Sequence, residues 1–296
     1  MTMTVKQVHP LFVGEVAGIK LSADLDEATI DALKKAIDDY AVLVFHGQDF
    51  DDDGLLAFGR RFGSMAAPRN HRAERRLKHG EIADISNLNA KGGVRDRSDH
   101  RRLDSLANQL WHSDASFRPI SGELSMLYAH VVPPVGGDTE FADLRAAYDA
   151  LDDGLKAEIG GLIAEHSIFH SRGLLGHTDY TEVERAALPD VRHPLVRTHP
   201  GSGRKTLYMG AHAAHIIGWP IPEGRLLLRD LMDHATERRF VHAHAWQPGD
   251  LVIWDNRCTL HRGRRYDDAA YKRDLRRVTT QDMTSAADNP GLAAAT

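Results

Sequence analysis

The chain has 296 residues, of which 42% are hydrophobic and 27% are charged, and its formal net charge is -5. These values are typical of a globular protein with a large core, and they give no electrostatic reason to expect nucleic acid or an anionic membrane as a partner. Cys258 is the single cysteine, which excludes the disulfide-stapled secreted class and favours a cytoplasmic location. We find neither a secretion signal nor an apolar run of the ~18 residues that a membrane span needs.

Apolar spacing in the first part of the chain predicts helix, strand, helix. Residues 26–40 place their aliphatic side chains on one helical face, and residues 41–47 form an apolar run that predicts a buried strand. A second helix is expected in 51–63, with Gly63 as its C-terminal cap.

Residues 64–102 are rich in arginine and contain one short predicted strand within 81–89. A solvated loop is the simplest interpretation of most of these charges. A long polar segment ahead of a candidate metal motif is also where a lid over an anionic substrate would lie.

The second half of the chain alternates predicted strands with short helices. The expected elements are a strand in 124–132, a turn in 133–139, a helix in 143–151, a capping box at Thr181 and Glu184, a hairpin from 193–199 and 205–210, a helix in 223–235, and a strand, tight turn and extended piece in 249–263. Residues 285–296 have little to bury and are expected to be a mobile tail. The chain is therefore predicted to be one domain over 1–284, mainly β with peripheral helices.

The stretch WHSDASF (111–117) contains the most informative pair of side chains. His112 and Asp114 are two positions apart, so on an extended backbone they point the same way and could hold a metal ion. Such a pair is common by chance and needs a third ligand. The 18 histidines offer several candidates, namely His166 and His170 on a possible helix, His212, His215, His242, His244 and His261.

His261 stands out because two arginines follow it. Arg273 lies twelve residues further on, and Arg277 four residues beyond that. The planar guanidinium group suits two-pronged binding of carboxylates, so this pattern favours an anionic ligand close to the metal. The alternative for Arg273 is a surface ion pair with Asp268 or Asp274, which would contribute little.

Four ordered motifs carry a family resemblance. WHSD (111–114), GGDT (136–139) and WDNRCTLH (254–261), with the trailing arginine pair, resemble the Fe(II)- and 2-oxoglutarate-dependent dioxygenases of the taurine dioxygenase family. Within that family, NQLWHSD and GSGRK are most similar to the 2,4-dichlorophenoxyacetate (2,4-D) dioxygenases. The similarity extends from about His9 to Thr280.

The resemblance implies a double-stranded β-helix, or jelly roll, with iron at one open end of the barrel. It implies that His112, Asp114 and His261 bind Fe(II), and that 2-oxoglutarate and O2 take the remaining positions. The far carboxylate of 2-oxoglutarate would then meet Arg273 and Thr139. Lys272 is a rival for this contact, and a turn hydroxyl is the simpler interpretation of Thr139.

The resemblance also implies a substrate. Arg277 matches the position that binds the anionic head of the substrate, Asn108 matches a position lining the same pocket, and Arg69 would help from the basic stretch. An aryloxyalkanoate such as 2,4-D would be hydroxylated at the carbon between the ether oxygen and the carboxylate, giving a phenol and glyoxylate together with succinate and CO2. Asn108 could instead bond neighbouring backbone groups, and Arg69 could be solvated.

Several alternatives stay open. The same chemistry could act on an alkyl sulfonate such as taurine, the fold could be a metal-binding jelly roll without catalysis, and the basic stretch could indicate a nucleic-acid demethylase. Trp111, Phe117 and Trp254 could line an aromatic pocket, although aromatic residues in strands are more often core. GSGRKT (201–206) fails the pattern of a phosphate-binding loop. The ring substituents, the stereochemical preference and whether the chain forms a homo-oligomer are not determined by the sequence.

Overall fold

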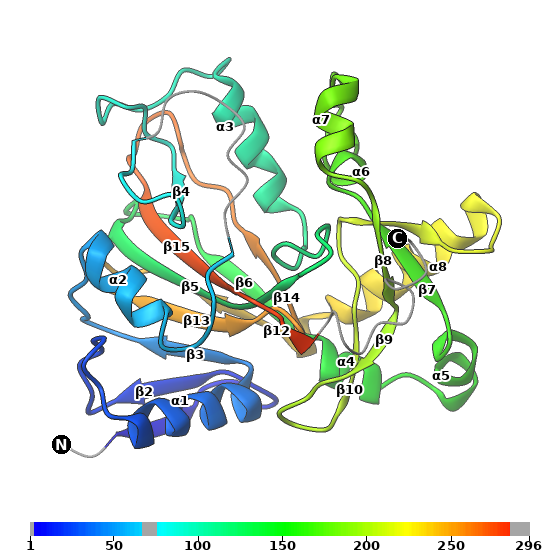
Figure 1. Cartoon of the computed structure of the whole chain (residues 1–296), viewed down its shortest axis with the longest axis horizontal. Helices are drawn as coiled ribbons and strands as arrows, with labels where there is room; N and C mark the ends of the chain where they lie inside the picture. The colour runs from blue at the N-terminus through cyan, green and yellow to red at the C-terminus, as the bar shows by residue number, and fades with distance from the viewer. Residues whose placement is uncertain (1–2, 67–75, 285–296) are drawn as a thin grey trace.

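Figure 1 shows the computed structural model, which describes residues 3–66 and 76–284. Arg69, part of the basic stretch and the expected tail in 285–296 lie outside these ranges. The helices are α1 (Glu27–Tyr40), α2 (Asp52–Gly59), α3 (His100–Ser105), α4 (Leu144–Asp149), α5 (Asp153–Ile159), α6 (Ile168–Gly173), α7 (Glu182–Ala187) and α8 (Ile221–Ala235), with 3-10 turns η1 (Leu106–Gln109) and η2 (Arg238–Phe240).

The strands outnumber the helices. They are β1 (Thr4–Gln7), β2 (Gly14–Ala17), β3 (Val42–Phe45), β4 (Ala83–Ser86), β5 (Gly122–Val131), β6 (Thr139–Asp143), β7 (Ile163–His166), β8 (Val191–Pro194), β9 (Val196–Thr198), β10 (Lys205–Leu207), β11 (Ala213–Ile216), β12 (Val241–His244), β13 (Leu251–Asp255), β14 (Thr259–Gly263) and β15 (Asp274–Gln281). The prediction of a mainly β protein with peripheral helices is confirmed.

The largest sheet has seven strands in the order β1-β2-β3-β13-β5-β15-β4. Side chains alternate between its two faces, as a pleated strand requires. On one face, Leu43 and Ile253 pack with residues of α1 and α2. On the other face, Val44 and Val252 join a second apolar cluster that includes Phe141 of β6. This sheet is therefore buried on both sides, which explains why β3 is apolar throughout and β13 is apolar up to its last residue, Asp255.

The second sheet that matters for function has the order β12-β6-β14. Phe141 faces the large sheet, whereas its neighbours Ala142 and Leu260 face a third cluster that is built with α4 and α8. The two sheets are antiparallel except at the parallel β2–β3 pair, and they face each other across an apolar layer, which is the sandwich of a jelly roll. The predicted double-stranded β-helix is thus confirmed.

Local sequence signals explain several element boundaries. The Asp26 side chain accepts a hydrogen bond from the Thr29 backbone N–H at 2.7 Å and so caps α1. Thr181 and Glu184 form the expected capping box at the start of α7. The prediction that Gly63 caps the second helix is wrong, because α2 ends at Gly59 and Arg61 and Phe62 then continue with tighter backbone bonds to residues 58 and 59.

Two other predictions need correction. His166 ends β7 whereas His170 lies on α6, so the pair does not share a helix. The charges of the basic stretch are not mainly solvated within the described residues. Arg76 bonds Asp84 and Asp274 at 2.7 Å each, and Arg102 bonds Asp268 at 2.8 Å. Arg76 thus connects the segment to the first residue of β15, and Arg102 connects it to the loop before this strand, which composition alone could not indicate.

Among the described residues, no helix has both the length and the apolar character needed to cross a membrane.

Candidate metal centre and its cavity

A backbone contact brings His112 and His261 together. The two residues form an isolated antiparallel bridge, in which the His112 N–H donates to the His261 carbonyl at 3.0 Å and the His261 N–H donates back at 2.9 Å. Residues paired in this way lie directly opposite each other with their side chains on the same face. Their ring centroids are accordingly 4.2 Å apart.

Asp114 completes a buried cluster. Its carboxylate oxygens lie 3.8 Å from Nε2 of His112 and 3.7 Å from Nε2 of His261, and one ligand atom from each of the three residues lies within 4.8 Å of the others. The expectation that His112 and Asp114 point the same way is therefore met. Whether the three residues bind a metal stays a prediction.

The protonation states of the cluster suit a cation. The Nδ1 atom of His112 is 2.8 Å from the Leu110 carbonyl, which can only accept, so the proton belongs on Nδ1 and Nε2 keeps its lone pair. Burial lowers the pKa of both the His112 and the His261 imidazoles, so both are neutral at neutral pH. Metal binding requires this neutral form.

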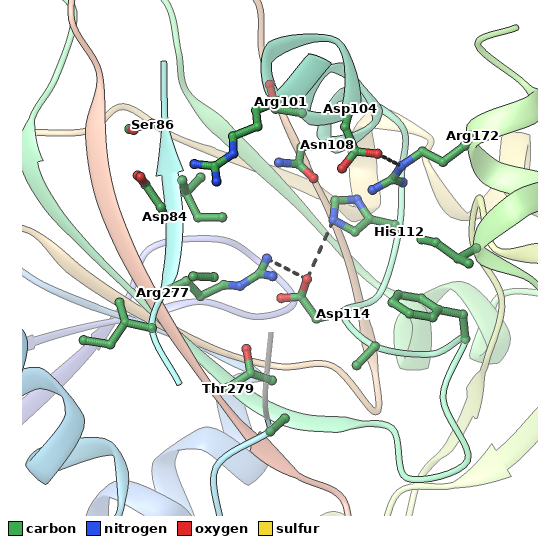
Figure 2. Close-up of a pocket in the computed structure, with 18 of the residues that line it drawn as sticks. Asp84, Ser86, Arg101, Asp104, Asn108, His112, Asp114, Arg172, Arg277 and Thr279 are labelled. Atoms are coloured by element: carbon green, nitrogen blue, oxygen red, sulfur yellow. Dashed lines mark hydrogen bonds and ion pairs between the residues drawn. The ribbon is translucent and has the colours of Figure 1, made fainter. Parts of the chain in front are cut away.

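The Asp114 carboxylate stays ionised despite its burial. Burial raises its pKa, but neighbouring charge more than offsets this effect and brings the pKa to about 2. With both histidines neutral, the cation responsible is Arg277, whose Nη1 lies 2.6 Å from Oδ1 (Figure 2). The Ser125 hydroxyl donates to the other oxygen at 2.7 Å.

Strand periodicity explains why these partners face the cluster. Leu275 belongs to the apolar layer between the two sheets, and Arg277 and Thr279 follow it at steps of two along β15. Ser125 has the same relation to Leu127 on β5. A serine inside the apolar run 124–129 of β5 was the available signal for this side of the site, and sequence reasoning missed it.

A cavity of about 340 Å³ opens beside the cluster. Of the residues expected at the site, it is lined by His112, Asp114, Asn108 and Arg277. Figure 1 shows α3 on one side of this region and α6 with α7 on the other, and all three helices contribute lining residues. The placement of Asn108 near the cluster agrees with expectation.

Several lining residues were not foreseen. Asp104 of α3 accepts from Arg172 of α6 at 2.9 Å, so an ion pair links the two helices across the cavity (Figure 2). Phe117 and His212 also line the cavity, with ring centroids 4.9 Å apart. The expectation that aromatic residues belong to the core is right for Trp254, which is fully buried, but wrong for Phe117.

Arg273 lies buried at the start of β15 without a carboxylate partner among the described residues. Its Nη2 donates to the Gly137 carbonyl at 3.3 Å, and its Nε has no hydrogen-bond partner. Burial lowers the pKa of Arg273 to about 10, which still leaves it charged at neutral pH. The alternative of a surface ion pair is wrong, since Asp268 and Asp274 bond other arginines.

Thr139 lies in the chain between Gly137, whose carbonyl accepts from Arg273, and Phe141, which pairs with His261 of the cluster. Thr139 begins β6 rather than ending a turn, and its hydroxyl accepts from Nε1 of Trp246 at 3.0 Å. On β6 it lies two residues before Phe141, which pairs with His261, so Thr139 is on the same face about 7 Å along the strand. Lys272, the rival of Arg273, is exposed.

The other candidate histidines do not join the cluster. His212 packs edge-on against His112 at 6.2 Å, His244 bonds Asp250 at 3.1 Å, and His215 lies 3.7 Å from Glu165. Among the described residues, a second group of possible ligands comprises His199, Asp255 and Cys258. In that group His199 and Arg257 already bond the Asp255 carboxylate, which leaves it poorly placed to bind a metal.

Comparison with known proteins defines the class. Residues 4–279 match the model of the family described as "Taurine catabolism dioxygenase TauD, TfdA family". The chain belongs to this family.

Individual relatives are similar over nearly the whole chain. The chain is 50% identical over 282 residues to an alpha-ketoglutarate-dependent 2,4-dichlorophenoxyacetate dioxygenase of Burkholderia sp. (strain RASC), covering 95% of each chain. It is 39% identical to an (S)-phenoxypropionate/alpha-ketoglutarate-dioxygenase of Sphingobium herbicidovorans, covering 86% of this chain and 87% of the relative. The crystal structure of AAD-2 in complex with Mn(II) and N-oxalylglycine is similar with a TM-score of 0.89 and 47% identity, covering 96% of this chain and 98% of AAD-2.

A buried cation without a counter-ion costs stability, which gives a test of Arg273. We expect Arg273→Met to raise the free energy of unfolding of the ligand-free protein by about 1 kcal/mol or more, since Met occupies similar space without a charge. Arg145 is the matched control, because it is equally buried but bonds Asp143. Arg145→Met should lower the same quantity by about 3–5 kcal/mol. Urea unfolding followed by circular dichroism measures both free energies. Similar losses of stability in the two variants would contradict the conclusion that Arg273 is buried without a counter-ion.

Proposed function

We propose that the protein is an Fe(II)- and 2-oxoglutarate-dependent dioxygenase that hydroxylates an aryloxyalkanoate such as 2,4-D next to its ether oxygen. The products would be a phenol and glyoxylate, with succinate and CO2 from the cosubstrate. One observation carries the proposal: the Arg277 guanidinium bonds a buried cluster of two histidines and a carboxylate, and Arg273, four residues earlier in the chain, is a second buried guanidinium that no carboxylate pairs among the described residues.

The donor set fits iron. His112, Asp114 and His261 would hold it, because two neutral imidazoles and one ionised carboxylate on one side of the ion form the donor set of non-haem Fe(II) oxygenases. Bound Fe(II) would supply the activation of O2 that is coupled to oxidative decarboxylation of 2-oxoglutarate. The protein's part is to position the reactants and to exclude water.

Arg273 and Thr139 would bind the far carboxylate of 2-oxoglutarate. An unpaired buried guanidinium is costly unless an anion neutralises it, and the Thr139 hydroxyl still has a proton to donate after accepting from Trp246. The similar relatives are named as alpha-ketoglutarate-dependent, and the AAD-2 crystal contains N-oxalylglycine, also a dicarboxylate.

Arg277 would bind the substrate's carboxylate in the cavity. It already bonds Asp114, yet its Nε has no hydrogen-bond partner, so the guanidinium keeps a free donor. Asn108 would help to line this end, and the Phe117 ring offers an apolar surface for an aryl group. Arg69 keeps its proposed supporting role near the pocket, although it lies outside the described residues.

Three alternatives are weaker. An alkyl sulfonate such as taurine carries an anionic head that Arg277 could also bind, but relatives with 50% identity are named for 2,4-D. A metal-binding jelly roll without catalysis would not need the buried, unpaired Arg273. A nucleic-acid demethylase is not favoured by the described part of the basic stretch, where Arg76 and Arg102 are paired with carboxylates.

We further propose that residues 1–284 act as one domain and that the protein works in the cytoplasm. The family match over 4–279 supports the first statement. The single buried thiol of Cys258, which a reducing compartment preserves, supports the second.

Turnover assays separate the candidate substrates. With Fe(II), 2-oxoglutarate and O2, we expect succinate release with 2,4-D to exceed that with taurine by ~10-fold or more, together with stoichiometric phenol. His112→Ala and Asp114→Ala should abolish this turnover. Strong succinate release with taurine alone would overturn the choice of substrate.

The two arginines have separable kinetic signatures. Arg277→Ala should raise KM for 2,4-D by about tenfold or more with little change in KM for 2-oxoglutarate, because it removes the contact to the substrate's head group. Arg273→Ala is the matched variant and should show the opposite pattern. If the two KM effects were exchanged, the assignments of Arg273 and Arg277 would have to be exchanged as well.

A further inference from the structure

Asn256 lies in the turn between β13 and β14 and is fully buried. It is too far along the chain from Asp114 to attract attention in the sequence, and it does not line the cavity. We infer that Asn256 is a positioning residue that fixes the Asp114 carboxylate through Ser125 and thereby sets the affinity of the cluster for a divalent metal ion. This inference rests on the proposed function of the cluster.

The orientation of the Asn256 amide is determined by its neighbours. Oδ1 lies 3.0 Å from Nε1 of Trp254 and 3.1 Å from the Asp114 backbone nitrogen. Both of these groups can only donate, so the atom facing them must be the carbonyl oxygen. The NH2 group therefore faces the opposite way, towards the Glu123 carbonyl at 3.2 Å and the Ser125 hydroxyl at 2.9 Å.

The amide in turn orients the Ser125 hydroxyl. Since Nδ2 of Asn256 can only donate, Ser125 accepts this bond and keeps its own proton for another partner. Two acceptors are within reach, Asp114 Oδ2 at 2.7 Å and Thr279 Oγ1 at 2.9 Å. The shorter bond goes to the ionised carboxylate, which is the stronger acceptor. Hydrogen bonds thus run in one direction from Asn256 through Ser125 to Asp114.

The hydrogen bond from Ser125 balances a second interaction of the Asp114 carboxylate, its ion pair with Arg277. Arg277 binds Oδ1 of Asp114, whereas Ser125 binds Oδ2, so the two partners hold the group from different sides. Without the Asn256 amide, Ser125 is free to rotate its proton towards Thr279. Asp114 would then keep Arg277 as its main partner and be less well placed to share a cation with His112 and His261. Outer partners of this kind typically change metal affinity by about 10–100-fold.

The backbone of the turn is held independently of the side chain. The Asn256 carbonyl accepts from the Ser113 hydroxyl at 2.7 Å, and its N–H donates to the Glu123 carbonyl at 2.8 Å. Gly122 allows β5 to approach the Asp114 backbone closely, because a Cβ at this position would lie 2.8 Å from the Asp114 carbonyl oxygen. A substitution of the Asn256 side chain leaves these backbone contacts in place.

The test is Mn(II) binding by purified protein without cosubstrate or substrate, with free Mn(II) measured by electron paramagnetic resonance. We expect Asn256→Ala and Ser125→Ala each to raise the Kd for Mn(II) by about tenfold or more. Thr279→Val is the matched control, because it removes the other side-chain partner of Ser125 but not the connection to Asp114, and it should change Kd by less than ~3-fold. The double variant Asn256→Ala/Ser125→Ala should weaken Mn(II) binding by less than the two single effects combined, because Asn256 reaches the Asp114 carboxylate through Ser125 and touches Asp114 directly only at its backbone N–H.

A spectroscopic readout separates positioning from loss of structure. At saturating Co(II), the visible absorption of the Asn256→Ala complex should differ from that of the original protein, which a merely structural loss of stability would not produce. Unchanged Kd and spectrum in Asn256→Ala, or additive effects in the double variant, would overturn the inference. If Asn256→Ala does not fold, Ser125→Ala decides, and a Kd within ~3-fold of the original protein would overturn it. Absence of Mn(II) binding by the original protein would instead contradict the proposed function.

Discussion

The site depends on the two-bond backbone bridge between His112 and His261. This bridge adds the loop that carries His112 and Asp114 to the edge of β14, so two stretches about 150 residues apart share one face of the sandwich. The same ladder pairs β14 with β6 and places Thr139 two positions from Phe141, the partner of His261. The spacing between the candidate metal cluster and Thr139, the proposed cosubstrate contact, is therefore set by strand register, which is far stiffer than side-chain rotamers.

The interior of the sandwich explains how charge is tolerated there. The strands bury apolar side chains on both faces, and Ser125, Arg277 and Thr279 are polar groups that enter the layer between the sheets next to the cluster. Arg277 and Ser125 bond the Asp114 carboxylate, and the charge of Arg277 keeps it ionised with a pKa of about 2. Arg273 is different, because its charge is buried without an anion among the described residues. Such an uncompensated group lowers stability in the free protein and becomes favourable when a carboxylate binds.

The sequence predicted those features that depend on local spacing and missed those that depend on distant contacts. The helix in 26–40, the strand in 41–47 and the adjacency of His112 and Asp114 follow from periodicity alone. The third member of the cluster does not, because several histidines were equally available and His261 was selected by its arginines and a family resemblance. The prediction of Gly63 as a helix cap failed because α2 ends at Gly59 and the next residues form bonds to the carbonyl three positions back. No sequence pattern pointed to Asn256, since its bonds to Asp114 and Ser125 span more than 100 positions.

The central claim is that His112, Asp114 and His261 bind one metal ion as a unit. The most direct test is a crystal structure of the protein grown with Mn(II), with the ion located by its anomalous scattering. The account predicts a single strong peak within roughly 2.0–2.3 Å of one nitrogen from each histidine and one Asp114 oxygen. A peak bound elsewhere, or one bound to His112 and Asp114 with His261 out of reach, would contradict it.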